Sequence, residues 1–369
     1  MQSFLVNDMM MGRRSFMAGS AALAGSAALA ANPGRAAAPA LKGGNGIVTP
    51  RKGGLDFQDP WDNLYMFGKI WSGYDAPVVG AFHGIMFARF PQQRMVPCFN
   101  FVGIGVMQAM IDKDGYLRMK SREVGLFTDL RTGDVLETWD NPFTGEKNEV
   151  YHFYNVGGGG RIGPEIPQFV IPGNPDTPTR MNEGSVFPDE NGKYPFILPF
   201  EQYGADDMLL AWDYTHYHKN PVTPAGWPKS STGDYVSPAE HFTFRVSRDE
   251  LEDRSLPAVR MYSGFSRSSQ FWPFMQMGGT PYADGVLSGR LHSHKGLKGY
   301  DEVPRKALDY LEKHAPEYLT IHDGWPTSSP RLDTWTVYSQ DIEPETAGYA
   351  WTPSDPALRP LTGKGRVRP

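Results

Sequence analysis

Cysteine is almost absent from this sequence, because Cys98 is the only one among 369 residues. An intramolecular disulfide is therefore excluded, and burial of apolar surface must stabilise the fold. Long apolar runs are missing too. No segment after residue 38 approaches the roughly 18 uninterrupted apolar residues of a membrane-spanning helix, and the apolar run before it is short and alanine-rich. We therefore expect no stable membrane anchor.

Clusters of lysine and arginine are also lacking, and the net charge of the chain is −5. Without residues 1–38, 33 basic and 40 acidic residues remain. Such a mildly acidic chain is a poor candidate for binding nucleic acid or anionic lipid. The chain contains no GxGxxG after a strand, no GxSxG and no HExxH. We therefore expect no cofactor, no metal and no covalent serine or cysteine catalysis.

The first 38 residues are typical of an export signal. Arg13-Arg14 and Phe16 precede a weakly apolar Ala/Gly/Ser/Leu run, with candidate cleavage sites near Ala30 and Ala38. A basic segment, a short apolar segment and a small-residue exit define a signal peptide. The paired arginines resemble a twin-arginine signal, which exports folded proteins; an ordinary Sec signal is the alternative. We expect a periplasmic or secreted protein.

Aromatic residues make up 13% of the chain, which also holds 41 glycines and 32 prolines. This mixture favours strands joined by tight turns. Apolar runs at 81–90, 95–111 and 116–130 follow one another closely, and Asp-Gly at 114–115 separates the last two as in a hairpin. The sequence therefore predicts a mainly β fold: an antiparallel meander, closed or curved into a lipocalin-like barrel, with a few peripheral helices.

The pattern divides the chain into an export signal (1–38), an extended arm or linker (39–60), a single β-barrel-like domain (61–350) and a C-terminal tail (351–369). Further strands are expected in YPFILPFEQYG and in TWTVYSQ near the end, and an ordered loop or lid over 157–190. The clearest helix is predicted over 303–315, with Pro304 in its first turn. A second, short helix is expected after Ser247.

Two histidines lie two positions apart in LLAWDYTHYHKNP (209–221). If 208–218 is a strand, one face carries Trp212, Tyr214, His216 and His218, and the face changes from apolar to ionisable along its length. Such a gradient is expected of a barrel wall that runs from the floor of a cavity to its mouth. Asp213 and Tyr217 would then point away.

Three interpretations of this stretch remain open. Imidazoles and phenols so close together could move protons near neutral pH in a pocket, with His216 or His218 as the base and Tyr214 as the proton donor. His216 and His218 could instead share a metal ion, although no further ligand follows at a known spacing. His292 and His294 form a similar pair but lie among Gly, Ser and Lys, as in a solvated loop. Simple packing with hydrogen-bonded polar tips is the third interpretation.

Neighbouring runs offer further candidates for substrate contact. They are Tyr154 beside His152, and His241 with Thr243 and Arg245 in EHFTFRV. The apolar segment FWPFMQMG (271–278) could plug one end of the barrel, or Trp272 could line a cavity for a flat ligand. Arg267 could then bind a carboxylate or phenolate at the mouth.

The FWPFMQMG segment and SREVGLFTDLRTGDVLETWDNPFTGE (121–146) resemble the DUF1838 family of bacterial proteins, which are often secreted. The resemblance extends over about residues 60–345. It implies no established catalytic residues. A lipocalin-like barrel is the fold that we expect for such a protein from the same strand pattern.

These observations predict an exported, cofactor-independent enzyme, a lyase, isomerase or hydrolase, that acts by acid–base chemistry on a small aromatic or apolar molecule in a barrel cavity. One alternative is a binding protein of the same shape that holds such a molecule without turnover. Another is a metalloenzyme that uses His216 and His218.

Overall fold

The computed structural model describes most of residues 50–350, within one compact unit that begins after residue 46. The expected signal (1–38) and tail (351–369) lie outside the described residues, as does most of the expected loop over 157–190. The described residues are 48, 50–158, 161–165, 168–170, 178–180, 195–215, 217–297, 299–300, 302–325 and 334–350.

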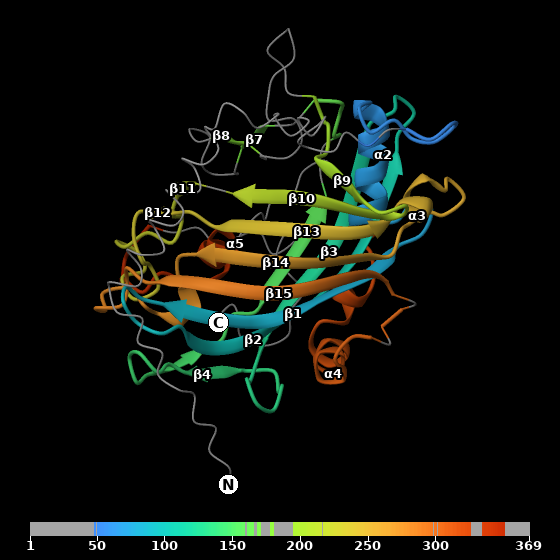
Figure 1. Ribbon diagram of the computed structural model, residues 1–369. Helices are drawn as coiled ribbons and strands as arrows, with labels where there is room; N and C mark the ends of the chain where they lie inside the picture. Colours follow the sequence, from blue (N-terminus) through green and yellow to red (C-terminus); the bar gives the residue numbers. More distant parts are fainter. Residues whose placement is uncertain are drawn as a thin grey trace, which may run out of the picture. The chain divides into compact units, whose positions relative to one another are not determined.

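A nine-stranded antiparallel sheet dominates the described residues, so the mainly β prediction is confirmed (Figure 1). At one turn, Gly115 has a φ of 89°, which favours glycine, and it connects β2 to β3 where the hairpin was predicted. The strands, in the order in which they pair, are β6 (Phe153–Gly158), β3 (Leu117–Thr128), β2 (Val96–Ile111), β1 (Val78–Arg89), β15 (Val286–Leu297), β14 (Met261–Ser269), β13 (Ala239–Ser247), β10 (Asp207–Thr215) and β9 (Phe200–Tyr203).

The sheet is not closed into a barrel in the described part of the chain, because its edge strands β6 and β9 do not pair with each other. Three two-stranded sheets accompany it. They are formed by β4 (Thr138–Asp140) with β5 (Lys147–Glu149), β7 (Gln168–Val170) with β8 (Pro178–Arg180), and β11 (His218–Lys219) with β12 (Tyr235–Val236).

The two faces of the large sheet are covered differently. On the outward face, alternate residues of β1, β2, β3 and β6 pack against α4 (Arg305–His314) and the 3-10 turn η2 (Pro316–Leu319). On the inward face, α2 (Pro60–Trp71) covers one end. The 3-10 turn η1 (Pro273–Met275) and α5 (Thr334–Asp341) cover the other end. The inward face therefore has two separate apolar clusters.

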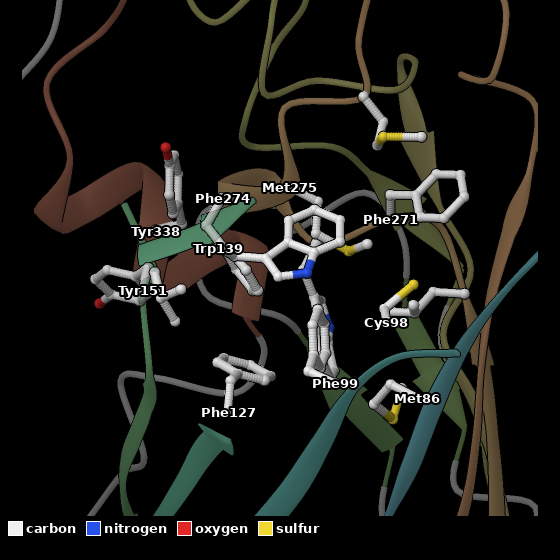
Figure 2. Close-up of a cluster of buried hydrophobic side chains, with 14 of the residues drawn as sticks. Met86, Cys98, Phe99, Phe127, Trp139, Tyr151, Phe271, Phe274, Met275 and Tyr338 are labelled. Atoms are coloured by element: carbon white, nitrogen blue, oxygen red, sulfur yellow. The ribbon is translucent and has the colours of Figure 1, made fainter. Parts of the chain in front are cut away.

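The cluster under η1 contains the FWPFMQMG segment. Phe271, Trp272 and Phe274 are each at most 2% exposed, and the Phe274 ring lies 4.8 Å from that of Phe127 on β3. Figure 2 shows Phe274, Phe99, Phe127 and Trp139 gathered in this cluster. Cys98 is also buried here as a free thiol. The segment thus packs as an apolar plug over one end of the inward face.

Several helices differ from those predicted. The helix predicted over 303–315 is confirmed as α4, and Ser247 caps the short α3 (Arg248–Glu252). The α2 helix, with Asp59 as its N-cap, was not predicted. The strand predicted in TWTVYSQ is wrong: it is α5, in which Trp335 and Tyr338, three residues apart, enter the core. Tertiary packing here overrides the strand preference of aromatic and β-branched residues.

Two further segments also depart from expectation. Only Phe200–Tyr203 of the strand predicted in YPFILPFEQYG is a strand. His292 and His294 do not lie in a loop but within β15. No helix in the described ranges has the length and apolar character needed to span a bilayer.

Candidate functional site

Polar side chains lie on the inward face between the two apolar clusters. On β3, Val124 and Leu126 face outward toward α4, so Glu123 faces inward because successive strand residues alternate. On β13, Phe244 and Val246 pack in the cluster under α2, so Glu240 lies on the same inward face. Two carboxyl groups therefore stand where the sheet would otherwise be apolar.

Curvature of the sheet brings these two strands toward each other. Four strands separate β3 from β13 in the pairing order, yet the charges of Glu240 and Arg267 both act on the carboxyl of Glu123. In Figure 1, β3 passes behind β13 and β14. The two carboxyl groups thus face a common interior.

Arg267 on β14 is opposite Glu240 in the strand register and forms an ion pair with it. The side chains of Glu240 and Arg267 are 19% and 15% exposed, so the pair is largely withdrawn from solvent. The guanidinium of Arg267 also lies over the ring of Trp272, 5.6 Å from its centroid. Arg267 is therefore held by an anion on one side and an aromatic ring on another.

Glu123 has a different environment. Its pKa is raised from 4.5 to about 7, mainly because burial removes water from the carboxylate and then because of the negative charge of Glu240. The positive charge of Arg267 and a hydrogen bond from Asn155, its cross-strand neighbour on β6, act in the opposite direction. Both protonation states of Glu123 are therefore populated near neutral pH.

Part of the surface of Glu123 nevertheless remains accessible, since the residue is only half-buried. Its neighbours in the next two strands along the row are Gly105 and Gly80, which carry no side chain, and the side chain of Met107 lies against both glycines. The space beside Glu123 is therefore partly filled by a flexible methionine.

Aromatic rings form the wall of this interior. Phe82, Phe242 and Phe265 face inward but are only half-buried, and the rings of Phe242 and Phe265 stack at 4.8 Å. The Phe82 ring lies over Gly103, where an added Cβ would come within 1.7 Å of the ring. Glycine at 103 is therefore needed for Phe82 to lie flat across the neighbouring strand.

The sequence profile of the family described as "Protein of unknown function (DUF1838)" matches residues 76–341, and so includes β1 to α5 and all the residues of this interior. The chain belongs to the DUF1838 family. No curated protein matches it significantly.

Two solved structures show a weak likeness to this DUF1838 protein. A mutant of the Rh. blastica porin has 10% identity and a TM-score of 0.16, covering 60% of this chain and 99% of its own. The structure of MucB in complex with MucA(peri) has 9% identity and a TM-score of 0.11, covering 66% and 96%. Scores this low support no statement about fold or function.

The expected histidine strand of this DUF1838 protein ends earlier than expected. β10 stops at Thr215, and His218 begins the separate strand β11, where it is buried and its Nδ1 lies 2.8 Å from the carbonyl oxygen of Lys219. His216 lies outside the described residues. The backbone of Tyr214 is opposite Glu240 in the strand register, which places this residue beside the carboxyl pair.

Trp212 faces inward but lies in the cluster under α2. It is 2% exposed, and its ring stacks on that of Phe67 at 4.8 Å. Tyr154 lies on the outward face and packs edge-on against Tyr318 of η2 at 5.1 Å. The structure thus surrounds both residues with protein side chains.

His241 and Arg245 lie on the outward, exposed side of β13. Nδ1 of His241 is 2.7 Å from Oδ1 of Asp213, and a guanidinium nitrogen of Arg245 is 2.9 Å from Oδ1 of Asp207. The sheet therefore separates them from Glu123. Of the residues proposed from sequence, Arg267 pairs with Glu240, and Trp272 is buried in the cluster under η1 with its ring beneath the guanidinium of Arg267.

Glu123, Glu240 and Asn155 were missed by the sequence analysis, although a signal for two of them was present. Glu123 is in phase with Leu117 and Met119 on β3, and Glu240 is in phase with the phenylalanines of EHFTFRV. A carboxylate is unusual among the alternate residues of a strand that face the apolar side. The alternation itself therefore marked them as inward-facing acids.

A pocket on the outward face is lined in part by His83, His294 and Glu302. It lies on the side of the sheet away from the carboxyl pair. In the described part of the chain, no three His, Cys, Asp or Glu side chains are arranged to hold a metal ion. The metalloenzyme alternative involves His216, which lies outside the described residues, and it stays a prediction.

Proposed function

We propose that this protein is an exported, cofactor-independent enzyme that performs acid–base chemistry on a small aromatic or apolar molecule, with Glu123 as the group that transfers the proton. The observation that carries the proposal is the position of Glu123: a half-buried residue whose carboxyl has a pKa of about 7, in an interior walled by aromatic rings. A lyase, isomerase or hydrolase reaction fits such a group.

General acid–base catalysis is most effective when the pKa of the group lies near the working pH. Glu123 can then accept a proton from the substrate in one step and return it in the next. The Glu240–Arg267 ion pair supports this role in two ways. The charge of Glu240 raises the pKa of Glu123, and its ion pair holds Arg267 in place. A carboxyl group whose pKa is raised by burial and by a neighbouring carboxylate is typical of acid–base sites.

This proposal changes the roles that the sequence analysis assigned to several residues. Glu123 replaces His216 and His218 as the proposed base. Tyr214 remains a candidate proton donor because its backbone pairs with Glu240. Arg267 acts as a positioning residue for the carboxyl groups, since its guanidinium forms an ion pair with Glu240. The proposal includes a lipocalin-like enclosed interior. The approach of β3 to β13 supports it.

A second candidate is a binding protein that holds the same kind of molecule without turnover. The half-buried, inward-facing rings of Phe82, Phe242 and Phe265 favour it, because such surfaces bind apolar ligands without any chemistry. The distinction between the two candidates lies in whether a bound molecule is transformed.

The test is to incubate the purified protein with a collection of small aromatic and apolar compounds and to follow their conversion by liquid chromatography and mass spectrometry. We expect conversion of at least one compound, slowed about 100-fold or more by Glu123→Gln. The matched control is Glu137→Gln, the same change at an exposed position. Equal rates in wild type and Glu123→Gln would refute the role of Glu123. Binding without any conversion would favour the second candidate.

A further inference from the structure

One acidic and one basic side chain, Glu240 and Arg267, act on the carboxyl of Glu123, and they form an ion pair with each other. Lys295 also lies on the inward face, but its Nζ donates to three carbonyl oxygens, those of Lys69, Ser72 and Val259, each at 2.9 Å. When Glu123 ionises, its negative charge has no cation of its own.

The neighbouring surface is suited to a positive charge. Faces of aromatic rings carry partial negative charge and attract ammonium groups, more strongly when water is excluded. Phe82 and Phe265 are half-buried rings on the inward face, whereas the half-buried ring of Phe242 stacks on that of Phe244 at 5.5 Å and on that of Phe265 at 4.8 Å. A carboxylate together with several ring faces is a common arrangement for recognising amines and quaternary ammonium groups.

An anionic ligand would be repelled by the carboxyl groups that attract a cation. The guanidinium of Arg267, whose charge acts on Glu123, pairs with Glu240 through Nη1 and lies over the ring of Trp272, while its buried Nε has no hydrogen-bond partner among the described residues. An anion at this nitrogen would lie beside the carboxylate of Glu240, and like charges at such distances repel. This argues against the carboxylate or phenolate ligand that Arg267 suggested from sequence alone.

We infer that the interior binds a small organic cation, an amine or a quaternary ammonium compound with an aromatic or apolar body, whose charged group is held by Glu123 and the inward phenylalanine rings. This inference rests on the proposed function, because it specifies the substrate class of the same site. It also requires that binding depend on the protonation state of Glu123.

The expected pH dependence follows from the groups that face Glu123. These are Glu240 on β13, Arg267 on β14 and Asn155 on β6, whereas Lys295 on β15 is bound to carbonyl oxygens. Only ionised Glu123 attracts the cation. Apparent affinity is reduced by the fraction of protein in the competent state, so it should rise roughly tenfold from pH 6 to pH 8.

Three probes of one shape test the inference by isothermal titration calorimetry. They are benzyltrimethylammonium, neopentylbenzene, which is its neutral isostere, and phenylmethanesulfonate, which is an anion. The charges of these probes do not change between pH 6 and pH 8. We expect the cation to bind about tenfold or more tighter than the isostere at pH 8. Glu123→Gln should remove both this preference and the pH dependence, whereas Glu137→Gln should retain both.

Three outcomes would overturn the inference: equal or tighter binding of the isostere or the anion, wild-type affinity that does not rise with pH, and no binding of any probe at millimolar concentration. The pH series on wild type keeps the test decisive even if Glu123→Gln folds poorly.

Failure of the proposed function would give a different result from failure of this inference. Tight cation binding without conversion of any compound would support this inference and contradict the proposed enzymatic function. Conversion of only uncharged compounds would support the enzymatic function and contradict the inference that the substrate is a cation.

Discussion

The carboxyl group of Glu123 on β3 and that of Glu240 on β13 act on each other electrostatically across the interior, although four strands separate them in the sheet. Arg267 neutralises only one of the two by a direct ion pair. Ionisation of the other carboxyl group, that of Glu123, is therefore unfavourable. Such an arrangement reduces stability, and carboxyl groups with strongly perturbed pKa values cluster at functional sites.

The first prediction concerns the stability of the protein as a function of pH. The pKa of Glu123 is raised to about 7 in the folded state from an ordinary value of 4.5. The folded state thus binds the proton more tightly than the unfolded state, and the free energy of unfolding should fall as pH rises from 4.5 to 7. Glu123→Gln should remove this contribution and be more stable than wild type at pH 8 by about 1–3 kcal/mol.

Urea denaturation of both proteins at pH 5 and pH 8 provides the measurement. The two should have similar stability at pH 5, where Glu123 is protonated, and diverge at pH 8. Glu137→Gln, at an exposed position, should follow wild type at both values. A Glu123→Gln protein that is less stable than wild type at pH 8 would show that the ionised carboxylate is well solvated or paired.

The second prediction concerns the aromatic wall. Gly103→Ala places a Cβ within 1.7 Å of the Phe82 ring, which must then move. Overpacking of this kind costs about 1–3 kcal/mol of stability. It should also weaken binding of the benzyltrimethylammonium probe, because the displaced ring loses its position in the interior.

Gly264→Ala is the matched control, since Gly264 is exposed in the middle of β14 and nothing lies within 4 Å of the added Cβ. Alanine there should leave stability unchanged or raise it by up to about 1 kcal/mol. Thermal unfolding and calorimetric titration of both variants supply the comparison. If Gly103→Ala behaved like Gly264→Ala, the Phe82 ring would not be fixed over Gly103.

The sequence was sufficient to predict the antiparallel β fold, the hairpin turn at Gly115 and the α4 helix, because these depend on local patterns. Alternation in EHFTFRV also separates two faces correctly. The sequence analysis chose the face of His241 and Arg245 for function, because imidazole and guanidinium are chemically active groups. The phenylalanines on the other face mark it as the inward one, and Glu240 belongs to it.

Other features depend on tertiary structure that a single sequence does not contain. Nothing in the strand pattern states that the sheet curves enough to bring β3 near β13, so the coupling of Glu123 to Glu240 could not be predicted. Trp335 and Tyr338 have high strand propensity, and only their packing in the core makes α5 a helix. The expected barrel closure depends on edge pairing over long sequence separations, which local patterns do not specify.

The third prediction concerns export. If Arg13-Arg14 belongs to a twin-arginine signal, the double substitution to Lys-Lys should abolish transport, because the export machinery requires the arginine pair. Fractionation of cells and immunoblotting of the periplasmic and cytoplasmic fractions provide the measurement. Arg35→Lys, the same change outside the pair, should leave export intact. Normal export of the Lys-Lys variant would indicate the Sec route.

The fourth prediction separates packing from ligand contact at Trp212, which the sequence analysis assigned to the substrate. Its ring is buried and stacks on Phe67, so Trp212→Ala should cost about 3–5 kcal/mol of stability, as other large-to-small core substitutions do. Binding of the benzyltrimethylammonium probe should fall only in proportion to the folded fraction. Trp61→Ala is the control of the same residue type, because Trp61 is 42% exposed on α2 and its loss should cost at most about 1 kcal/mol. Chemical denaturation beside calorimetric titration of both variants distinguishes the two roles. A stable Trp212→Ala protein that no longer binds the probe would place Trp212 in the binding site.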